Sequence, residues 1–421
     1  MFANPDELFR LGSVTNSGMI TATGTTGLGV YLGVGGSVGN ANGGTISGGM
    51  TGVLVKTGSG TVENAGTITN AAGTAGVAVN LEGAGPNLVI IDAGAKFTGQ
   101  VKANTTASNT LALGTAGGAG TMSAFSKYVG FKSLQVEAGS AWTIAGSFAG
   151  ATTISGSATI AQTGGSLSGG ATVAGGALDN AGGISGPTAV PLQSGGPITN
   201  EKTGTIVGAQ IGIQLSAAGT VANKGTITGT TKDGISLAAG GVVSNSAGGS
   251  ISGGQVGIYA SLQTATVTNS GAISVPGNTG VWLTAGGVVT NMASATISGA
   301  LFCVQVSGAT GTVANSGSIA GTSSFGIYLK AGGSVSNSQG AIVSGGADGV
   351  HFGATGSATV SNAGSIAGTS HYGVWLAGSG SVSNASGGRI TGASAGVEVT
   401  GTNGFVSNAG AARFPATSAV S

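Results

Sequence analysis

The residues of this sequence that could do acid–base or metal chemistry are few and far apart. Its two histidines, one cysteine and scattered carboxylates show no spacing typical of a zinc site. Asp233 and Asp348 occupy the same position of an internal repeat, five repeats apart. At the ~4.8 Å spacing of stacked strands they would lie about 24 Å apart, too far for the carboxylate pair of a glycosidase. We therefore expect no catalytic residues, no metal site and no cofactor.

The remaining reactive side chains favour structural roles. Lys232 beside Asp233, and His351 near Asp348, are expected to be isolated polar residues on outward positions. Cys303 stands where the repeat usually has glycine, beside apolar positions, so we expect a buried and inert thiol. Glycine patterns that resemble phosphate loops lack their Lys-Ser/Thr partner, and the glycine-rich corners lack the Asp of a calcium repeat.

Aromatic residues, in contrast, gather in one register of the repeat. The motif G-[IV]-x-[LV] carries at its position x the residues Tyr31, Gln214, Ser236, Tyr259, Trp282, Gln305, Tyr328, His351, Trp375 and Glu398. Five of the eight Trp and Tyr residues of the chain fall in this register, and its polar members predict that it faces solvent. Trp282, Tyr328 and Trp375 belong to alternate repeats, which places them about 10 Å apart along one face.

This aromatic column has two interpretations. Flat rings at regular intervals could stack on the sugars of an extended glycan or form the apolar centre of a protein contact. Alternatively, the rings are scaffold, because aromatic side chains suit strands and cover neighbouring backbone. His371 and Tyr372 widen the possible patch. The candidate binding residues are Tyr259, Trp282, Tyr328, His351, Tyr372 and Trp375.

The composition excludes several classes of protein. Among 421 residues there are 88 glycines but only 7 prolines and no strict G-X-Y period, which excludes collagen. Regularly placed Val, Ile and Leu argue against disorder. Charged residues make up 5% of the chain, and 12 basic residues nearly cancel 11 acidic ones. This leaves no basic patch for nucleic acid or anionic lipid and predicts a neutral surface of Ser, Thr, Asn and Gln.

An internal repeat indicates the fold. An apolar-x-Asn triplet recurs with a period of 22–25 residues from Asn223 onward, and each unit reads as three short strands: [VI]-x-N, I-x-G and G-[IV]-x-[LV]. One such unit cannot bury its apolar residues alone, whereas stacked units can, because each strand then pairs with its equivalents in the next units. The sequence predicts an all-β parallel β-helix, a solenoid of about 18 coils with three strands per coil.

The repeated asparagines predict a structural ladder, in which side-chain amides hydrogen-bond from coil to coil. Its regular part comprises Asn223, Asn245, Asn269, Asn291, Asn315, Asn337, Asn362 and Asn384. The spacing also alternates, because every second coil has two extra residues in the corner after the Asn, as in NSAGGSI and NASGGRI. One edge of the solenoid is therefore expected to be ridged.

The segment from Ser108 to Phe148 interrupts the repeat and carries a family resemblance. Its pattern F-x-x-Y-x-x-F-x-x-L-x-V, followed by a tryptophan, uses Phe125, Tyr128, Phe131, Leu134, Val136 and Trp142. In this it resembles the passenger regions of bacterial autotransporter outer-membrane proteins. The resemblance implies a right-handed parallel β-helix displayed on, or released from, a bacterial surface. The absence of a signal peptide and of a C-terminal β-barrel departs from that family.

The expected organisation follows the repeat. Residues 1–11 are predicted to form a capping helix, 12–85 regular coils, 86–176 irregular coils with longer corners, 177–410 regular coils, and 411–421 a frayed tail. The expected function is that of a non-catalytic adhesin or matrix module, at the bacterial surface or secreted, with a host or matrix glycan or protein as partner. The chain is expected neither to bind nucleic acid nor to insert into a membrane. A polysaccharide-active enzyme and a self-associating fibre subunit are the alternatives.

Overall fold

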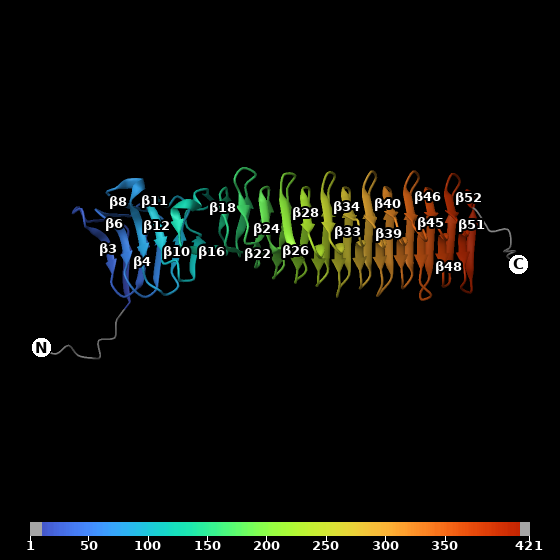
Figure 1. Ribbon diagram of the computed structural model, residues 1–421, viewed down its shortest axis with the longest axis horizontal. Helices are drawn as coiled ribbons and strands as arrows, with labels where there is room; N and C mark the ends of the chain where they lie inside the picture. Colours follow the sequence, from blue (N-terminus) through green and yellow to red (C-terminus); the bar gives the residue numbers. More distant parts are fainter. Residues whose placement is uncertain (1–10, 413–421) are drawn as a thin grey trace, which may run out of the picture. The chain divides into compact units, whose positions relative to one another are not determined.

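The structure is a computed structural model that describes residues 11–412. Strands and two short 3-10 turns, η1 (Gly73–Ala75) and η2 (Phe125–Lys127), make up its regular structure in that range. The predicted β-solenoid is confirmed, with parallel strands stacked in about 17 turns (Figure 1). The helix predicted at the N-terminus and residues 413–421 of the expected tail lie outside the described residues, whereas Ala411 and Ala412 form a strand rather than a frayed tail.

The chain divides into two compact units, Met1–Leu178 and Asp179–Ser421. In the N-terminal unit the longest stack consists of β1 (Gly12–Asn16), β4 (Gly36–Asn40), β7 (Gly60–Asn64), β10 (Leu88–Ile91), β13 (Asn109–Leu113), β16 (Phe131–Val136), β19 (Ala151–Ile154) and β22 (Ala171–Val173). A second stack consists of β2 (Met19–Thr21), β5 (Thr45–Gly48), β8 (Thr67–Asn70) and β11 (Lys96–Thr98).

Three smaller sets complete this unit. One stack contains β3 (Leu28–Leu32), β6 (Thr51–Val55), β9 (Val77–Leu81), β12 (Gln100–Ala103) and β15 (Tyr128–Val129). Another contains β14 (Gly120–Met122), β17 (Ala141–Ile144) and β20 (Ser157–Ile160). The last is a pair, β18 (Ser147–Phe148) with β21 (Ser166–Leu167). The irregular segment of the sequence therefore continues the parallel stacking with shorter and more varied strands.

The C-terminal unit has three strands in each regular coil. The strand β23 (Ala177–Asn180) spans its boundary. The first strands, which end in the repeated Asn, are β25 (Pro197–Asn200), β27 (Thr220–Asn223), β30 (Gly241–Asn245), β33 (Ala265–Asn269), β36 (Gly287–Asn291), β39 (Gly311–Asn315), β42 (Gly333–Asn337), β45 (Ala358–Asn362), β48 (Gly380–Asn384) and β51 (Gly404–Asn408).

The second and third strands follow each first strand around the coil. The second strands are β28 (Thr226–Gly229), β31 (Ser250–Gly253), β34 (Ala272–Val275), β37 (Thr296–Gly299), β40 (Ser318–Gly321), β43 (Ile342–Gly345), β46 (Ser365–Gly368), β49 (Arg389–Gly392) and β52 (Ala411–Ala412). The third strands are β29 (Asp233–Leu237), β32 (Val256–Ala260), β35 (Thr279–Leu283), β38 (Phe302–Val306), β41 (Phe325–Leu329), β44 (Val350–Phe352), β47 (Tyr372–Leu376) and β50 (Ala395–Val399). The long strands β24 (Gly183–Leu192) and β26 (Thr205–Leu215) run through both positions.

The core of each coil is built from the apolar residues of its three strands. In the coil of β33, β34 and β35, the side chains of Val267, Ile273, Val281 and Leu283 are fully buried. Each stacks on the equivalent residue of the next coil, as Val267 does on Val289. Because the inward set repeats in register, adding coils extends one continuous core, as expected of a solenoid.

The asparagine ladder exists as predicted. Each ladder Asn is buried, and its amide Nδ2 donates to the Oδ1 of the next Asn, at 2.8 Å from Asn245 to Asn269 and at 2.9 Å from Asn291 to Asn315. The same amide also lies within hydrogen-bonding distance of corner carbonyls, such as Ala295 O for Asn291. The ladder thereby gives corner carbonyls a second hydrogen bond, in addition to the backbone N–H of the next coil, as from Ser318 N to Ala295 O.

In the N-terminal unit the ladder ends where the sequence becomes irregular. Asn64, the last member, donates to Lys96 O instead of to another Asn. The strands continue in register beyond it, and the Asn position is filled in turn by Ile91, Leu113, Val136, Ile154 and Val173. A second, shorter ladder from Asn87 to Asn109 forms at the beginning of strands β10 and β13. Stacking therefore persists without an Asn at this position, provided that the side chain is apolar.

The alternating period has the predicted local cause. In every second coil of the C-terminal unit the corner after the Asn closes a tight turn, as in Gly249 N to Ser246 O and Ala295 N to Met292 O. After Asn245 and Asn291 the third residue of this turn has a positive φ, whereas the turn from Glu201 to Gly204 closes without one. Gly248 has φ of 83° there, whereas Ser294 adopts φ of 65° in the equivalent corner.

Breaking the ladder in its middle should destabilise the protein. Replacing Asn291 with Leu removes its buried hydrogen bonds to Asn315 Oδ1, Ala295 O and Ser318 O, and each lost bond costs about 0.5–1.5 kcal/mol. We expect the free energy of unfolding, measured in urea, to fall by about 2–4 kcal/mol. Thr290→Val, an outward position on the same strand, is the control, with a change below about 0.5 kcal/mol. Equal losses in the two variants would contradict the role of the ladder.

The Ser294 corner offers a stabilising substitution. A residue with a Cβ pays a steric cost in the left-handed region that glycine avoids. Ser294→Gly is therefore expected to raise the free energy of unfolding by about 0.5 kcal/mol, and Gly248→Ser to lower it by a similar amount. Thermal unfolding of both variants measures the two effects, and changes of the same sign would refute this explanation.

Candidate functional site

The aromatic column of the sequence lies in one register of the third strands. Strand pairing brings the column residues from Gln214 to Glu398 side by side, one per coil. Trp282, Tyr328 and Trp375 stand in alternate coils, as expected. Tyr31 belongs to β3 of the N-terminal unit, where Leu54 and Asn80 follow it in register, and its side chain is exposed.

A second register of large side chains was missed in the sequence. Phe302 and Phe325 pair at the beginning of their third strands, and Tyr372 begins the third strand two coils after Phe325. Each of these residues comes three positions before a residue of the aromatic column. Strict alternation along the strand would therefore place the two residues on opposite faces. The structure nevertheless brings the two registers into contact, as between Phe325 and Tyr328 at 5.6 Å. The residue between them that follows the first register is glycine, where a Cβ on Gly326 or Gly373 would lie 2.5–2.6 Å from backbone oxygen of the next coil.

We call the residues of the two registers the aromatic ridge: Tyr259, Trp282, Phe302, Phe325, Tyr328, His351, Tyr372 and Trp375. Their rings contact one another in two groups, Tyr259 with Trp282, and the six residues from Phe302 to Trp375. Tyr259 and Trp282 lie 5.3 Å apart between ring centroids, Phe302 stacks on Tyr328 at 5.8 Å, and Tyr372 lies 5.7 Å from Trp375. Ring planes are mostly tilted against each other rather than coplanar. Most of these side chains are half-buried, so they face solvent less fully than the sequence suggested.

The two tryptophans of the ridge are held in fixed orientations. The indole Nε1 of Trp282 donates to Ser307 Oγ and that of Trp375 to Thr400 Oγ1, each at 3.3 Å and each in the following coil. An indole held in this way loses little freedom when a ligand covers it, and this lowers the entropic cost of binding.

Asp348 and His351 contradict the expectation of isolated polar residues on outward positions. Asp348 is 1% exposed and His351 9% exposed. His351 Nδ1 lies 2.8 Å from Asp348 Oδ2, while the backbone N–H of Tyr372 donates to Asp348 Oδ1 at 3.0 Å. Asp348 occupies the register of the aromatic residues Phe325 and Tyr372 and contacts His351 as those residues contact Tyr328 and Trp375. The sequence feature that could have identified this pair is the motif D-G-V-H, which stands where the coils before and after have F-G-I-Y and Y-G-V-W.

Cys303 and Asp233, the other residues considered for chemistry, differ in their burial and in their pKa values. Cys303 is fully buried, as predicted, and burial raises the pKa of its thiol to about 12, which leaves it unreactive at neutral pH. Asp233 is half-buried, and desolvation raises the pKa of its carboxyl to about 6. The third-strand register separates Asp233 from Asp348 by five coils, as the sequence predicted.

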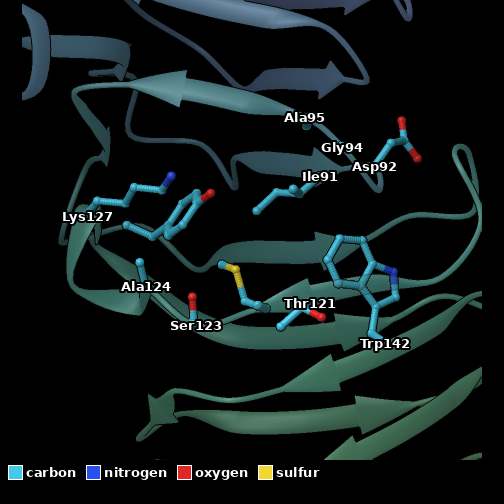
Figure 2. A pocket seen from close by; sticks show the side chains of 11 residues that line it. Ile91, Asp92, Gly94, Ala95, Thr121, Ser123, Ala124, Lys127 and Trp142 are labelled. Carbon is cyan, nitrogen blue, oxygen red and sulfur yellow. The ribbon is translucent and has the colours of Figure 1, made fainter.

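The N-terminal unit holds a small pocket in its irregular segment. Figure 2 shows this cavity of about 120 Å³, with Lys127 and Asp92 on opposite sides and Trp142 below Asp92. Burial lowers the pKa of Lys127 and raises that of Asp92. Asp92 Oδ1 accepts a hydrogen bond from Ala116 N, and Oδ2 is buried without a partner.

The aromatic residues of the passenger-like segment serve packing. Leu134, Val136 and Trp142 are buried, with the Trp142 indole donating to Gly114 O at 2.9 Å. Tyr128 packs edge-on against Phe97 and Phe131, while Phe125 contacts Phe148. These rings fill the longer corners of the irregular coils and form no open surface comparable to the aromatic ridge.

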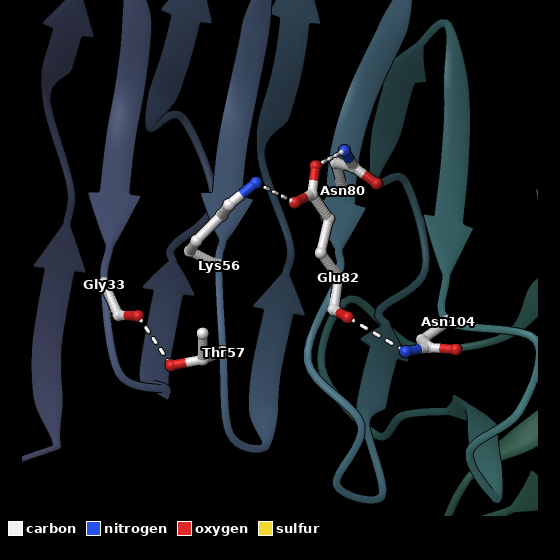
Figure 3. Close-up of polar contacts among 6 residues, drawn as sticks. All are labelled: Gly33, Lys56, Thr57, Asn80, Glu82 and Asn104. Carbon is white, nitrogen blue, oxygen red and sulfur yellow. Dashed lines mark hydrogen bonds and ion pairs between the residues drawn. The ribbon is translucent and has the colours of Figure 1, made fainter.

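Charged side chains join neighbouring coils instead of forming a patch. Figure 3 shows Lys56 paired with Glu82 of the following coil, while Asn80 donates to the same carboxylate and Asn104 donates to the Glu82 carbonyl. Lys224 and Glu201 pair across coils in the same way. Exposed pairs of this kind contribute at most about 1 kcal/mol each.

Comparison with known proteins identified no relative of this chain. No protein-family model, no curated protein and no solved structure matches this chain. Between residues 11 and 412 no helix is long and apolar enough to cross a membrane. Over the same range, no three His, Cys, Asp or Glu side chains lie close enough together to hold a metal ion. Function must therefore be argued from the geometry of the surface.

The raised pKa of Asp233 predicts a pH-dependent stability. Its carboxyl is protonated in the folded state up to about pH 6 but titrates near pH 4 when unfolded. This group therefore contributes stability below about pH 4 that is lost as the pH rises through about 6. In Asp233→Asn the free energy of unfolding should fall less than in the parent between pH 4 and pH 7. Urea titrations at both pH values measure this difference, and parallel changes in the two proteins would contradict it.

Proposed function

We propose that this chain is a non-catalytic β-solenoid module, displayed on a bacterial surface or secreted, that binds neutral extended glycans along the aromatic ridge. One observation carries the proposal: two groups of contacting rings, Tyr259 with Trp282 and the rings from Phe302 to Trp375, lie along the third strands of successive coils, on a chain that otherwise has few large or charged side chains. Rings at a regular spacing suit a polymer whose own units repeat, and uncharged surroundings suit a neutral one.

The surface and secretion parts of the proposal rest on the sequence resemblance. The pattern from Phe125 to Trp142 is similar to that of autotransporter passengers, and scarce cysteine fits a chain secreted unfolded through a pore. The solenoid fold is compatible with such a passenger. An adhesive or matrix role follows from combining that location with a binding ridge.

Binding without catalysis is favoured over the enzyme alternative. A polysaccharide-cleaving β-helix needs two carboxylates that reach the substrate from one groove. In the N-terminal unit Glu63 and Asp92 both border a groove of about 330 Å³. Asp92 is 2% exposed, however, with one carboxylate oxygen bonded to Ala116 N and the other buried. It therefore offers no oxygen to a substrate in that groove.

A glycan array tests the proposal. The parent is expected to bind one or more neutral oligosaccharides, and Trp282→Ala/Trp375→Ala should weaken that binding about tenfold or more, since each lost ring contact is worth about 0.5–1.5 kcal/mol. Tyr31→Ala removes an exposed ring outside the ridge and serves as the matched control. Unchanged thermal unfolding of both variants shows that the fold is retained. Equal binding by parent and double variant would remove the ridge as a glycan site.

A further inference from the structure

We infer that the Asp348–His351 pair is a polar recognition site within the aromatic ridge, in which His351 Nε2 accepts a hydrogen bond from a hydroxyl group of the glycan. The inference rests on the proposed function, because it assigns to one histidine the polar part of glycan binding. The tyrosine hydroxyls of the ridge rotate and can donate or accept a hydrogen bond. An acceptor held in a fixed orientation among the rings selects a ligand that also carries a hydroxyl donor.

The tautomer of His351 follows from its partner. Both oxygens of an ionised carboxylate accept hydrogen bonds, so the Nδ1 atom 2.8 Å from Asp348 Oδ2 must carry the proton. In a neutral imidazole the other nitrogen, Nε2, is then an unprotonated acceptor. Asp348 is itself fixed, because its Oδ1 accepts the backbone N–H of Tyr372 at 3.0 Å. The orientation of the imidazole is therefore set by a buried carboxylate that the next coil holds in place.

Aromatic rings enclose the imidazole on several sides. It stacks on Phe325 at 4.3 Å between centroids and 25° between planes, and meets Trp375 edge-on at 4.3 Å and 74°. Tyr328 lies edge-on at 5.1 Å. Within the described residues His351 Nε2 has no hydrogen-bond partner, yet it is not among the fully buried polar atoms, so solvent or a ligand can reach it. The Trp375 indole N–H is already bonded to Thr400, and Nε2 is an acceptor beside that ring whose orientation the bond to Asp348 fixes.

Neighbouring coils fill the positions of this pair with aromatic residues. Coils above and below carry Phe325 and Tyr372 at the register of Asp348, and Tyr328 and Trp375 at the register of His351. Aromatic residues therefore fill both positions without a buried charge. Burying a carboxylate costs free energy that its hydrogen bonds offset only in part. Packing therefore does not account for the pair, whereas a role in ligand recognition does.

The ligand must combine an apolar face with a hydroxyl donor. Strand spacing places Nε2 one coil, about 4.8 Å, from the strands that carry Tyr328 and Trp375. That is within the width of a single sugar ring, so one residue of a glycan can cover the Trp375 indole and donate a hydroxyl proton to Nε2. A neutral sugar satisfies both requirements.

The Asp348→Asn variant tests the inference while preserving the corner. The Tyr372 N–H requires an acceptor, so the substituted side chain points its amide oxygen there and its NH2 group toward His351 Nδ1. That hydrogen bond favours the other tautomer, in which Nε2 carries the proton and can no longer accept. Nitrogen NMR of the imidazole at about pH 8, where ordinary histidines are neutral, reports the tautomer without any ligand. We expect Nδ1–H in the parent and Nε2–H in the variant.

Binding is measured with neutral hexasaccharides of glucose, galactose and N-acetylglucosamine, and with the fully O-methylated form of each. The parent should bind at least one hexasaccharide about tenfold more tightly than its methylated form, which can stack but cannot donate. Asp348→Asn should lose that preference while keeping the weaker, stacking contribution. His351→Phe, which retains a ring but no acceptor, should behave in the same way.

The outcomes separate the two proposals. If the parent binds through Trp282 and Trp375 but Asp348→Asn prefers the free hexasaccharide to its methylated form as strongly as the parent does, the recognition role of His351 is wrong and the proposed function stands. If the parent carries its imidazole proton on Nε2, the inference also fails. If the parent binds none of the sugars on the array or among the hexasaccharides, the proposed function fails and the inference with it.

Discussion

The whole architecture depends on one constraint: a coil of 22–25 residues has too few apolar side chains to fold alone and must satisfy its backbone and corner groups through the next coil. Parallel pairing does this along the strands, and the buried Asn amides do it at the corner, where Asn245 and Asn291 each contact both the next Asn and a corner carbonyl. Side chains on the outward face are then not needed to hold the coils together. Large rings and a buried Asp–His pair can therefore appear in this part of the third strands without disturbing the stack.

Much of the fold could be predicted from the sequence because its period is visible residue by residue. The three strands per coil, the buried Cys303, the Asn ladder and the alternating corners all follow from spacing and residue type. The shift of the ladder from Asn64 to Asn87 and Asn109 could not be predicted, because its strand-start position has no counterpart in the regular repeat.

Only part of the candidate site could be predicted from the sequence, for a physical reason. The period of two identified Trp282, Tyr328 and Trp375, whereas Phe302 and Phe325, three positions earlier in their strands, were not singled out. The structure brings both sets into contact. Asp348 and His351 stand at the same two positions, so two residues that were expected to be isolated on the surface form a buried pair.

The Asn ladder also gives the stack a direction. Every Asn-to-Asn bond of the ladder within the described range runs from an amide to the coil that follows in the sequence, as from Asn16 to Asn40 and from Asn384 to Asn408. The dipoles of the side chains therefore add head to tail, much as peptide dipoles do along a helix. A partly formed stack presents unused N–H donors at its C-terminal face and filled acceptors behind them. Each finished coil is thus a template for its successor. When the stack is extended from its N-terminal side, each new coil meets a surface whose amide donors already point toward it.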